Sequence, residues 1–195
     1  MIEQDNQTLK PNEQKASGKR LILVFFVAFV VILLDQATKR FIEANVVYNT
    51  SWMPLEWLAP YFQITHIGNT GIAFGLFSGG SVVFALISIL VTGAIVYFAY
   101  TLPAEQTALR IVFGVVLGGA IGNLIDRLRQ GYVTDFLDFG PWPVFNVADM
   151  AVVFGAVALA ILMFYEERQY KKAEEASLRN NPPADELTDE QQPAN

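Results

Sequence analysis

The fourteen residues LILVFFVAFVVILL (21–34) contain no polar side chain, and this stretch decides the class of fold. A helix that crosses the roughly 30 Å of bilayer hydrocarbon needs about 20 mostly apolar residues. Further segments of this kind lie at about 81–100, 107–125 and 146–165. Because all four segments are apolar on every side, they suit lipid better than the core of a soluble protein. The sequence therefore predicts a membrane all-α protein with four transmembrane helices.

Composition narrows the possible functions. The chain has 195 residues, of which 53% are hydrophobic and only 16% are charged, against about 25% charged residues in soluble domains. A net charge of −6 argues against a surface that binds nucleic acid, since such a surface is basic. The absence of cysteine excludes disulfides and thiolate chemistry, and the single histidine, His66, gives little support to a zinc site or a histidine-based triad. We therefore expect no metal.

The first apolar segment has two possible interpretations. Lys19 and Arg20 precede it, as basic residues precede the apolar part of a secretory signal peptide. However, the sequence continues as LLDQATKRF and shows no small-x-small cleavage site. We therefore favour an uncleaved first helix.

Basic residues near the ends of the membrane segments predict the orientation. On the side of the two termini they are Lys10, Lys15, Lys19, Arg20, Arg168, Lys171 and Lys172. On the side of the loops they are Lys39, Arg40, Arg127 and Arg129. The excess on the terminal side predicts that both termini are cytoplasmic and that the loops at about 41–80 and 127–145 face outward.

The rest of the chain divides around this membrane domain. We expect a cytoplasmic tail at 1–19, a four-helix domain at 20–166 and a disordered acidic tail at 167–195. In the first outer loop, SWMPLEWLAPYF (51–62) carries aromatic side chains typical of the membrane interface. The following QITHIGNTGIAF (63–74) predicts short strands around a turn that contains glycine.

Polar residues at the ends of the membrane segments need an explanation, because unpaired charge in a bilayer is unfavourable. Asp35 and Lys39 are four residues apart, which places them on one helical face as an ion pair or as support for a site. Two N-x-x-D pairs follow at the outer ends of the third and fourth segments: Asn123 with Asp126, and Asn146 with Asp149. Taken singly, Asn146 is explained as an N-cap and Asp149 as an acid at a helix N-terminus. Those explanations do not account for the same polar pair at the same membrane face in two segments.

The connection QGYVTDFLDFGPWPVF (130–145) adds Asp135 and Asp138, each with apolar neighbours. Two aspartates that share a poorly hydrated site can hold one proton between them, which suits water activation by one carboxylate and proton donation by the other. The outer face then offers five acids, and spacing alone does not select a pair: Asp35, Asp126, Asp135, Asp138 and Asp149.

Four blocks of sequence together resemble a known family: DQATK (35–39), NTGIAFGLF (69–77), GNLIDRLRQGYVTDF (122–136) and FNVAD (145–149). Over about residues 20–165 the chain resembles signal peptidase II, a family of aspartic peptidases of the bacterial inner membrane. The resemblance implies that Asp135 and Asp149 are the catalytic pair. It implies supporting roles for Asp35, Lys39, Asn69, Gly71, Asn123, Asp126, Arg127 and Asn146. It assigns no role to Asp138.

The resemblance also implies a reaction. The substrate would be a prolipoprotein with a diacylglyceryl group on its lipobox cysteine, cut just before that cysteine at the outer membrane face. Membrane phospholipid would surround a monomeric enzyme without a metal or organic cofactor. A small β-cradle and an interfacial helix would come from the first outer loop. One departure is the short connection between Asp135 and Asp149, with the compact GPWP (140–143), which bears on how the site is covered.

Two other classes of function also fit a chain with these acids. An ion-coupled carrier would place them near the bilayer midplane and often show inverted repeats, whereas here they gather at one face. A purely structural membrane protein would use them to join helices, and would tolerate single Asp→Asn changes.

Overall fold

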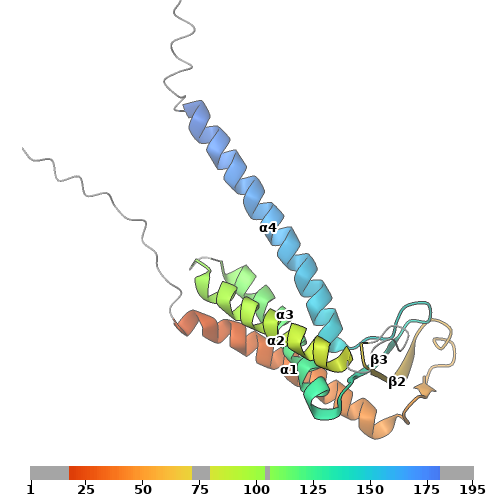
Figure 1. Ribbon diagram of the computed structural model, residues 1–195. Coiled ribbons are helices and arrows are strands. Elements are labelled where there is room, and N and C mark those ends of the chain that lie inside the picture. The colour runs from red at the N-terminus through yellow and green to blue at the C-terminus, as the bar shows by residue number, and fades with distance from the viewer. Residues whose placement is uncertain (1–17, 72–79, 104–105, 181–195) are drawn as a thin grey trace, which may run out of the picture. The chain divides into compact units, whose positions relative to one another are not determined.

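The computed structural model describes residues 18–71, 80–103 and 106–180. Its elements, in chain order, are α1 (Gly18–Asn45), β1 (Ser51–Trp52), β2 (Gln63–Asn69), α2 (Gly80–Thr101), α3 (Thr107–Gln130), β3 (Val133–Asp138) and α4 (Val147–Asn180) (Figure 1). Each of the four helices contains a stretch long and apolar enough to cross a membrane. The prediction of four membrane helices with a small sheet is therefore confirmed.

Helix α3 packs along both α1 and α2 (Figure 1). More than half of its apolar stretch is buried, against less than a fifth in each of the other three helices. Small residues make the contact with α1 close: a Cβ atom added at Gly114 would lie 2.8 Å from the backbone oxygen of Val24. Small residues at helix contacts are typical of membrane proteins, where dispersion between closely packed helices drives association. Helix α3 is thus the centre of the helical part.

The three strands form an antiparallel sheet in the order β1-β2-β3. The register pairs Ile67 with Asp135 and Asn69 with Val133, after an irregularity between Ile64 and Ile67. Strand β3 follows α3 closely, because Gly131 ends that helix in the left-handed conformation with φ 82°. The first four residues of β3 are buried, which brings the end of α3 and the sheet together around Asp135.

The segment 51–62 differs from the expectation. The interfacial helix expected from the first outer loop is not found here, because residues 56–61 form consecutive turns; residues 72–79 of that loop lie outside the described residues. Pro54 and Pro60 explain this difference, since the residue before a proline is disfavoured in the helical region and only five residues separate the two. Trp57 and Tyr61 are nevertheless strongly exposed, as expected of side chains at a membrane interface.

The fourth helix is longer than predicted. It continues through residues 166–180, so the tail expected to be disordered from 167 begins with about four turns of helix. Residues of high helix propensity, mainly Glu, Lys, Arg, Ala and Leu, explain the extension. Among the described residues, those up to 156 form one compact unit, which holds the start of α4, and those from 157 to 180 form a second. Residues 1–17 of the predicted N-terminal tail, residues 181–195 of the predicted C-terminal tail and residues 72–77 of the second family-like block lie outside the described residues.

Candidate active site

Asp135 lies on strand β3 and is fully buried. Its Oδ2 accepts a hydrogen bond from Asn69 Nδ2 at 2.8 Å, and its Oδ1 accepts one from Asn146 Nδ2 at 2.6 Å. Burial raises the pKa of Asp135 to about 6; the hydrogen bond from Asn69 opposes the rise, and the negative charge of Asp149 adds to it. The Asp135 carboxyl group can therefore hold or release a proton close to neutral pH.

Asp149 lies in the first turn of α4, where it and Asn146 form a reciprocal capping box. Asn146 Oδ1 accepts the backbone N–H of Asp149 at 2.9 Å, and Asp149 Oδ2 accepts the backbone N–H of Asn146 at 3.3 Å. Both simple explanations from the sequence, an N-cap and an acid at a helix N-terminus, therefore hold. The amide nitrogen of Asn146 remains available, and it is this atom that binds Asp135. Asn146 thus joins the two acids.

Two further asparagines are fixed so that their amide nitrogens face the acids. Asn69 Oδ1 accepts the backbone N–H of Gly71 at 2.8 Å, which leaves its nitrogen for Asp135. Gly71 has φ 77°, and an added Cβ would collide with the ring of Phe84, so only glycine fits this turn. Asn123 Oδ1 accepts from Lys39 Nζ at 2.9 Å and from Asn146 at 3.2 Å, while its Nδ2 donates to Asp149 at 2.7 Å.

Close to Asp135 and Asp149 lies a buried ion cluster, which we define as Asp35, Lys39 and Asp126. All three side chains are completely buried. Lys39 Nζ lies 2.9 Å from an oxygen of Asp35 and 2.9 Å from an oxygen of Asp126. The cluster joins α1 to α3, and Asn123 connects it to Asp149.

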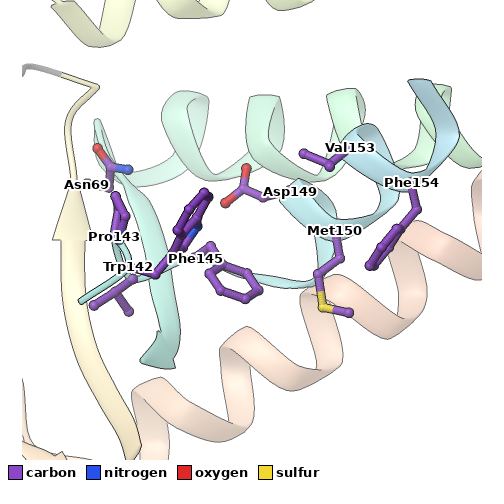
Figure 2. A pocket seen from close by; sticks show the side chains of 9 residues that line it. Asn69, Trp142, Pro143, Phe145, Asp149, Met150, Val153 and Phe154 are labelled. Carbon is purple, nitrogen blue, oxygen red and sulfur yellow. The ribbon is translucent and has the colours of Figure 1, made fainter. Parts of the chain in front are cut away.

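A pocket of about 420 Å³ opens beside Asp149. Figure 2 shows Asn69 at the end of β2 and Asp149 on α4 at its sides. The other lining residues are Trp142, Pro143, Val144, Phe145, Met150, Val153 and Phe154. The pocket therefore has a polar part at Asp149 and Asn69 and an apolar part along the first turns of α4. Within the described residues, no group of three His, Cys, Asp or Glu side chains is arranged to hold a metal ion.

Comparison with known proteins identifies the family. The sequence profile described as Signal peptidase (SPase) II matches residues 27–165. The chain belongs to the signal peptidase II family. It is a multi-pass membrane protein and an aspartic peptidase of the family that removes signal peptides from prolipoproteins.

Individual relatives agree with this assignment. The lipoprotein signal peptidase of Moorella thermoacetica is 45% identical over 132 residues, covering 68% of this chain and 86% of that protein. The one from Desulfitobacterium hafniense is 38% identical over 154 residues, covering 78% and 100%. A bacterial membrane enzyme solved by the in meso method at 2.3 Å has a TM-score of 0.65 at 27% identity, covering 81% of this chain and 94% of that structure. With this family assignment, neither an ion-coupled carrier nor a purely structural role is needed to explain the acids at the ends of the membrane segments.

The structure separates the predicted site residues of this signal peptidase II into groups. It brings Asn69, Asn123 and Asn146 into contact with Asp135 or Asp149. Arg127 lies beside them: its Nη1 donates to the backbone oxygen of Asn123 at 3.3 Å, and its guanidinium stands 5.5 Å from the ring centre of Phe84.

Asp138 is held away from the pair. Its carboxylate accepts from the hydroxyl of Thr65 at 2.8 Å and from the backbone N–H of Gly140 at 2.9 Å. It therefore fixes the start of the connection to α4.

Sequence reasoning missed Gln36. Its amide nitrogen donates to Asp126 Oδ1 at 2.9 Å and to the backbone oxygen of Gly122 at 3.2 Å. The only signal was its place beside Asp35 in DQATK, which does not reveal which way a helical side chain points.

Proposed function

We propose that Asp135 and Asp149 are the catalytic pair of this signal peptidase II. The observation that carries the proposal is the bridge through Asn146, which caps the helix of Asp149 and donates to Asp135. The two acids also differ in a useful way: Asp149 lines the pocket, while Asp135 is buried with a raised pKa. This arrangement suits a pair that holds one proton between its members.

In the proposed reaction, the ionised carboxylate takes a proton from water as the water oxygen attacks the scissile carbonyl carbon. The protonated carboxyl group donates to the developing oxyanion. Collapse of the tetrahedral intermediate breaks the C–N bond, and the nitrogen leaves as an amine after receiving a proton from the pair. Asn69, Asn123 and Asn146 keep the carboxylates in place, and Arg127 supplies positive charge beside them.

The proposed substrate is a prolipoprotein cut just before a cysteine that carries a diacylglyceryl group. The pocket supports this assignment, because its polar part lies at Asp149 and its apolar part is formed by Met150, Val153 and Phe154 of a membrane helix. An amide bond can lie at the first part while apolar substrate groups lie along the second. One chain supplies every residue of the site, so we propose that a monomer surrounded by phospholipid is sufficient.

We further propose that both termini are cytoplasmic and that the pair lies at the outer membrane face. Supporting this, basic residues flank the terminal sides of the membrane segments. The chain has no cysteine, so single cysteines can report orientation cleanly. In intact cells, a membrane-impermeant maleimide should label Glu56→Cys in the outer loop and should not label Ala176→Cys until the cells are opened. The reverse pattern contradicts this orientation.

The catalytic assignment is tested by cleavage of a diacylglyceryl-modified prolipoprotein in detergent or lipid. Asp135→Asn and Asp149→Asn should each lower the rate by at least about 10³-fold, because each removes one proton-transfer group. The matched control is Asp138→Asn, an acid on the same strand as Asp135 that lies outside the pair. If either variant, correctly folded, cleaves at the parental rate, the assignment is wrong.

A further inference from the structure

The two carboxylates of the buried ion cluster have a second set of partners. Asp35 Oδ1 accepts the backbone N–H of Ala148 at 2.9 Å. Asp126 Oδ2 accepts the backbone N–H of Thr134 at 3.2 Å. Ala148 directly precedes Asp149, and Thr134 directly precedes Asp135. Each carboxylate therefore binds the backbone N–H of the residue that directly precedes one of the two proposed catalytic aspartates.

Lys39 joins these two attachments. Its ammonium group lies 2.9 Å from each carboxylate. The path from Thr134 through Asp126, Lys39 and Asp35 to Ala148 thus consists entirely of short polar contacts. It spans from the strand of one aspartate to the helix of the other, so the ammonium connects the two backbones.

We propose that Lys39 is a positioning residue that sets the separation of Asp135 and Asp149. This inference rests on the proposed catalytic pair. An ammonium group has three donors, and here they go to Asp35, Asp126 and Asn123. No donor is left for substrate, so Lys39 acts through its neighbours.

Stability alone does not explain a cluster of this kind. Burying three charges carries a large desolvation penalty, and well-packed neutral residues are often equally stable or better. An ammonium group between two carboxylates makes short, charged contacts to both of them from one nitrogen atom, which neutral residues cannot do. Gln36 also helps to position Asp126, because its amide nitrogen donates to the other carboxylate oxygen of Asp126 at 2.9 Å. Both oxygens of Asp126 are then fixed between α1, α3 and β3.

Two variants test the proposal. Lys39→Arg keeps the charge, but a planar guanidinium cannot replace a point charge that lies at equal distance from three acceptors. The triple variant Asp35→Asn/Lys39→Met/Asp126→Asn removes all three charges while each amide oxygen can still accept its backbone N–H. The matched control is Arg40→Met, which removes a neighbouring cation that is largely exposed.

We expect both test variants to keep KM within about threefold and to lose at least tenfold in kcat. The triple variant should lose about 100-fold, since a displacement of about 1 Å at reacting groups has an effect of that size. Its thermal unfolding temperature in detergent should be no lower than that of the parent. A purely structural cluster would give the opposite pattern, with lower thermal stability and an unchanged kcat per folded molecule.

The outcomes separate this proposal from the one on which it rests. A folded triple variant with parental kcat overturns the positioning role, and so does a change confined to KM. If the triple variant does not fold, Lys39→Arg decides by the same criteria. Asp149→Asn is measured in the same assay: if it is inactive while the Lys39 variants are fully active, only the positioning role falls. If Asp149→Asn is active, the catalytic pair itself is wrong.

Discussion

The interface between α1 and α3 has two halves that follow the same spacing and have different chemistry. Gly114, Gly118 and Gly122 lie four residues apart on α3. A Cβ added at Gly118 would lie 2.6 Å from Val31 Cβ and 2.8 Å from the backbone oxygen of Ala28. One turn later, a Cβ added at Gly122 would lie 2.6 Å from Asp35 Oδ2. The same small residue thus admits an apolar neighbour in one half and a buried carboxylate in the other.

This difference separates stability from catalysis. The apolar half joins the helices by close packing, which is the main source of helix association in a membrane. The polar half contains completely buried charges, which do not favour folding unless every partner is in place. Ionisable groups in such positions are typical of function. Matched changes in the two halves should therefore have different readouts.

Of the changes that compare the two halves, Gly122→Ala is expected to have the largest effect. The new methyl group collides with Asp35 and displaces the carboxylate that binds the backbone N–H of Ala148, the residue before Asp149. We expect kcat for prolipoprotein cleavage to fall about 100-fold. The measurement is single-turnover cleavage together with thermal unfolding. Parental kcat in a folded Gly122→Ala variant would show that the polar half tolerates displacement.

The same substitution one turn earlier should mainly affect stability. In Gly118→Ala the methyl group meets Val31 and the backbone of α1, so the two helices must separate slightly. We expect the free energy of unfolding to fall by about 1–3 kcal/mol, as for other overpacked interiors. Cleavage per folded molecule should stay within about threefold of the parent. The contrast between the halves fails if Gly118→Ala lowers kcat as much as Gly122→Ala does.

A third prediction concerns the charge state of the pair. The pKa of Asp135 is raised to about 6, mainly by burial, so in the proposed pair the proton that Asp135 holds is lost as the pH rises through that value. We expect kcat/KM of the free enzyme to decrease above about pH 6. The hydrogen bond from Asn69 lowers this pKa, so Asn69→Ala should move the decrease to higher pH. Each profile is normalised to its own maximum, so that a general loss of rate does not hide the shift. A shift to lower pH would contradict the role given to Asn69.

The sequence predicted the membrane helices well because an apolar run of sufficient length has few alternatives in water or lipid. It predicted the loops less well: the prolines at 54 and 60 disfavour a helix in the 51–62 part of the first outer loop, and residues 166–180 extend α4. The two prolines already indicated that a helix is disfavoured in the first outer loop, and the helix propensity of residues 166–180 already indicated the extension of α4. The family resemblance outweighed the first indication, and the polar composition outweighed the second.

The candidate site was only partly predictable. Spacing left five acids open, and Asp135 and Asp149 were selected by resemblance to signal peptidase II. Spacing does not reveal that α1 and the start of α4 both pack against α3, which brings Asp35 next to the backbone N–H of Ala148 although the two are 113 residues apart. The capping role of Asn146 was predicted from its position, but its contact with Asp135 depends on where β3 lies. Hydrogen bonds between distant segments follow from the fold and are not visible in residue order.

The smallest effect is expected at Asp138, which extends the comparison from buried to partly exposed polar groups. Asp138, Thr65 and Ser51 form a short chain of hydrogen bonds across the sheet, with 2.8 Å between Ser51 and Thr65 and 2.8 Å between Thr65 and Asp138. Unlike Asp126, Asp138 is not completely buried, and each of its oxygens has one neutral donor. We expect Asp138→Ala to lower the free energy of unfolding by about 1 kcal/mol, the usual effect of such bonds.

Cleavage by Asp138→Ala should change little, because the connection that Asp138 begins is also held by backbone bonds between Leu137 and Phe145 at 2.8 and 3.1 Å. A rise in KM of at most about threefold is expected, since Trp142 and Pro143 of that connection line the pocket. Denaturant unfolding and steady-state cleavage measure the two effects separately. A loss of kcat as large as that of Gly122→Ala would mean that partly exposed polar groups at the sheet control the pair as strongly as the buried ion cluster does.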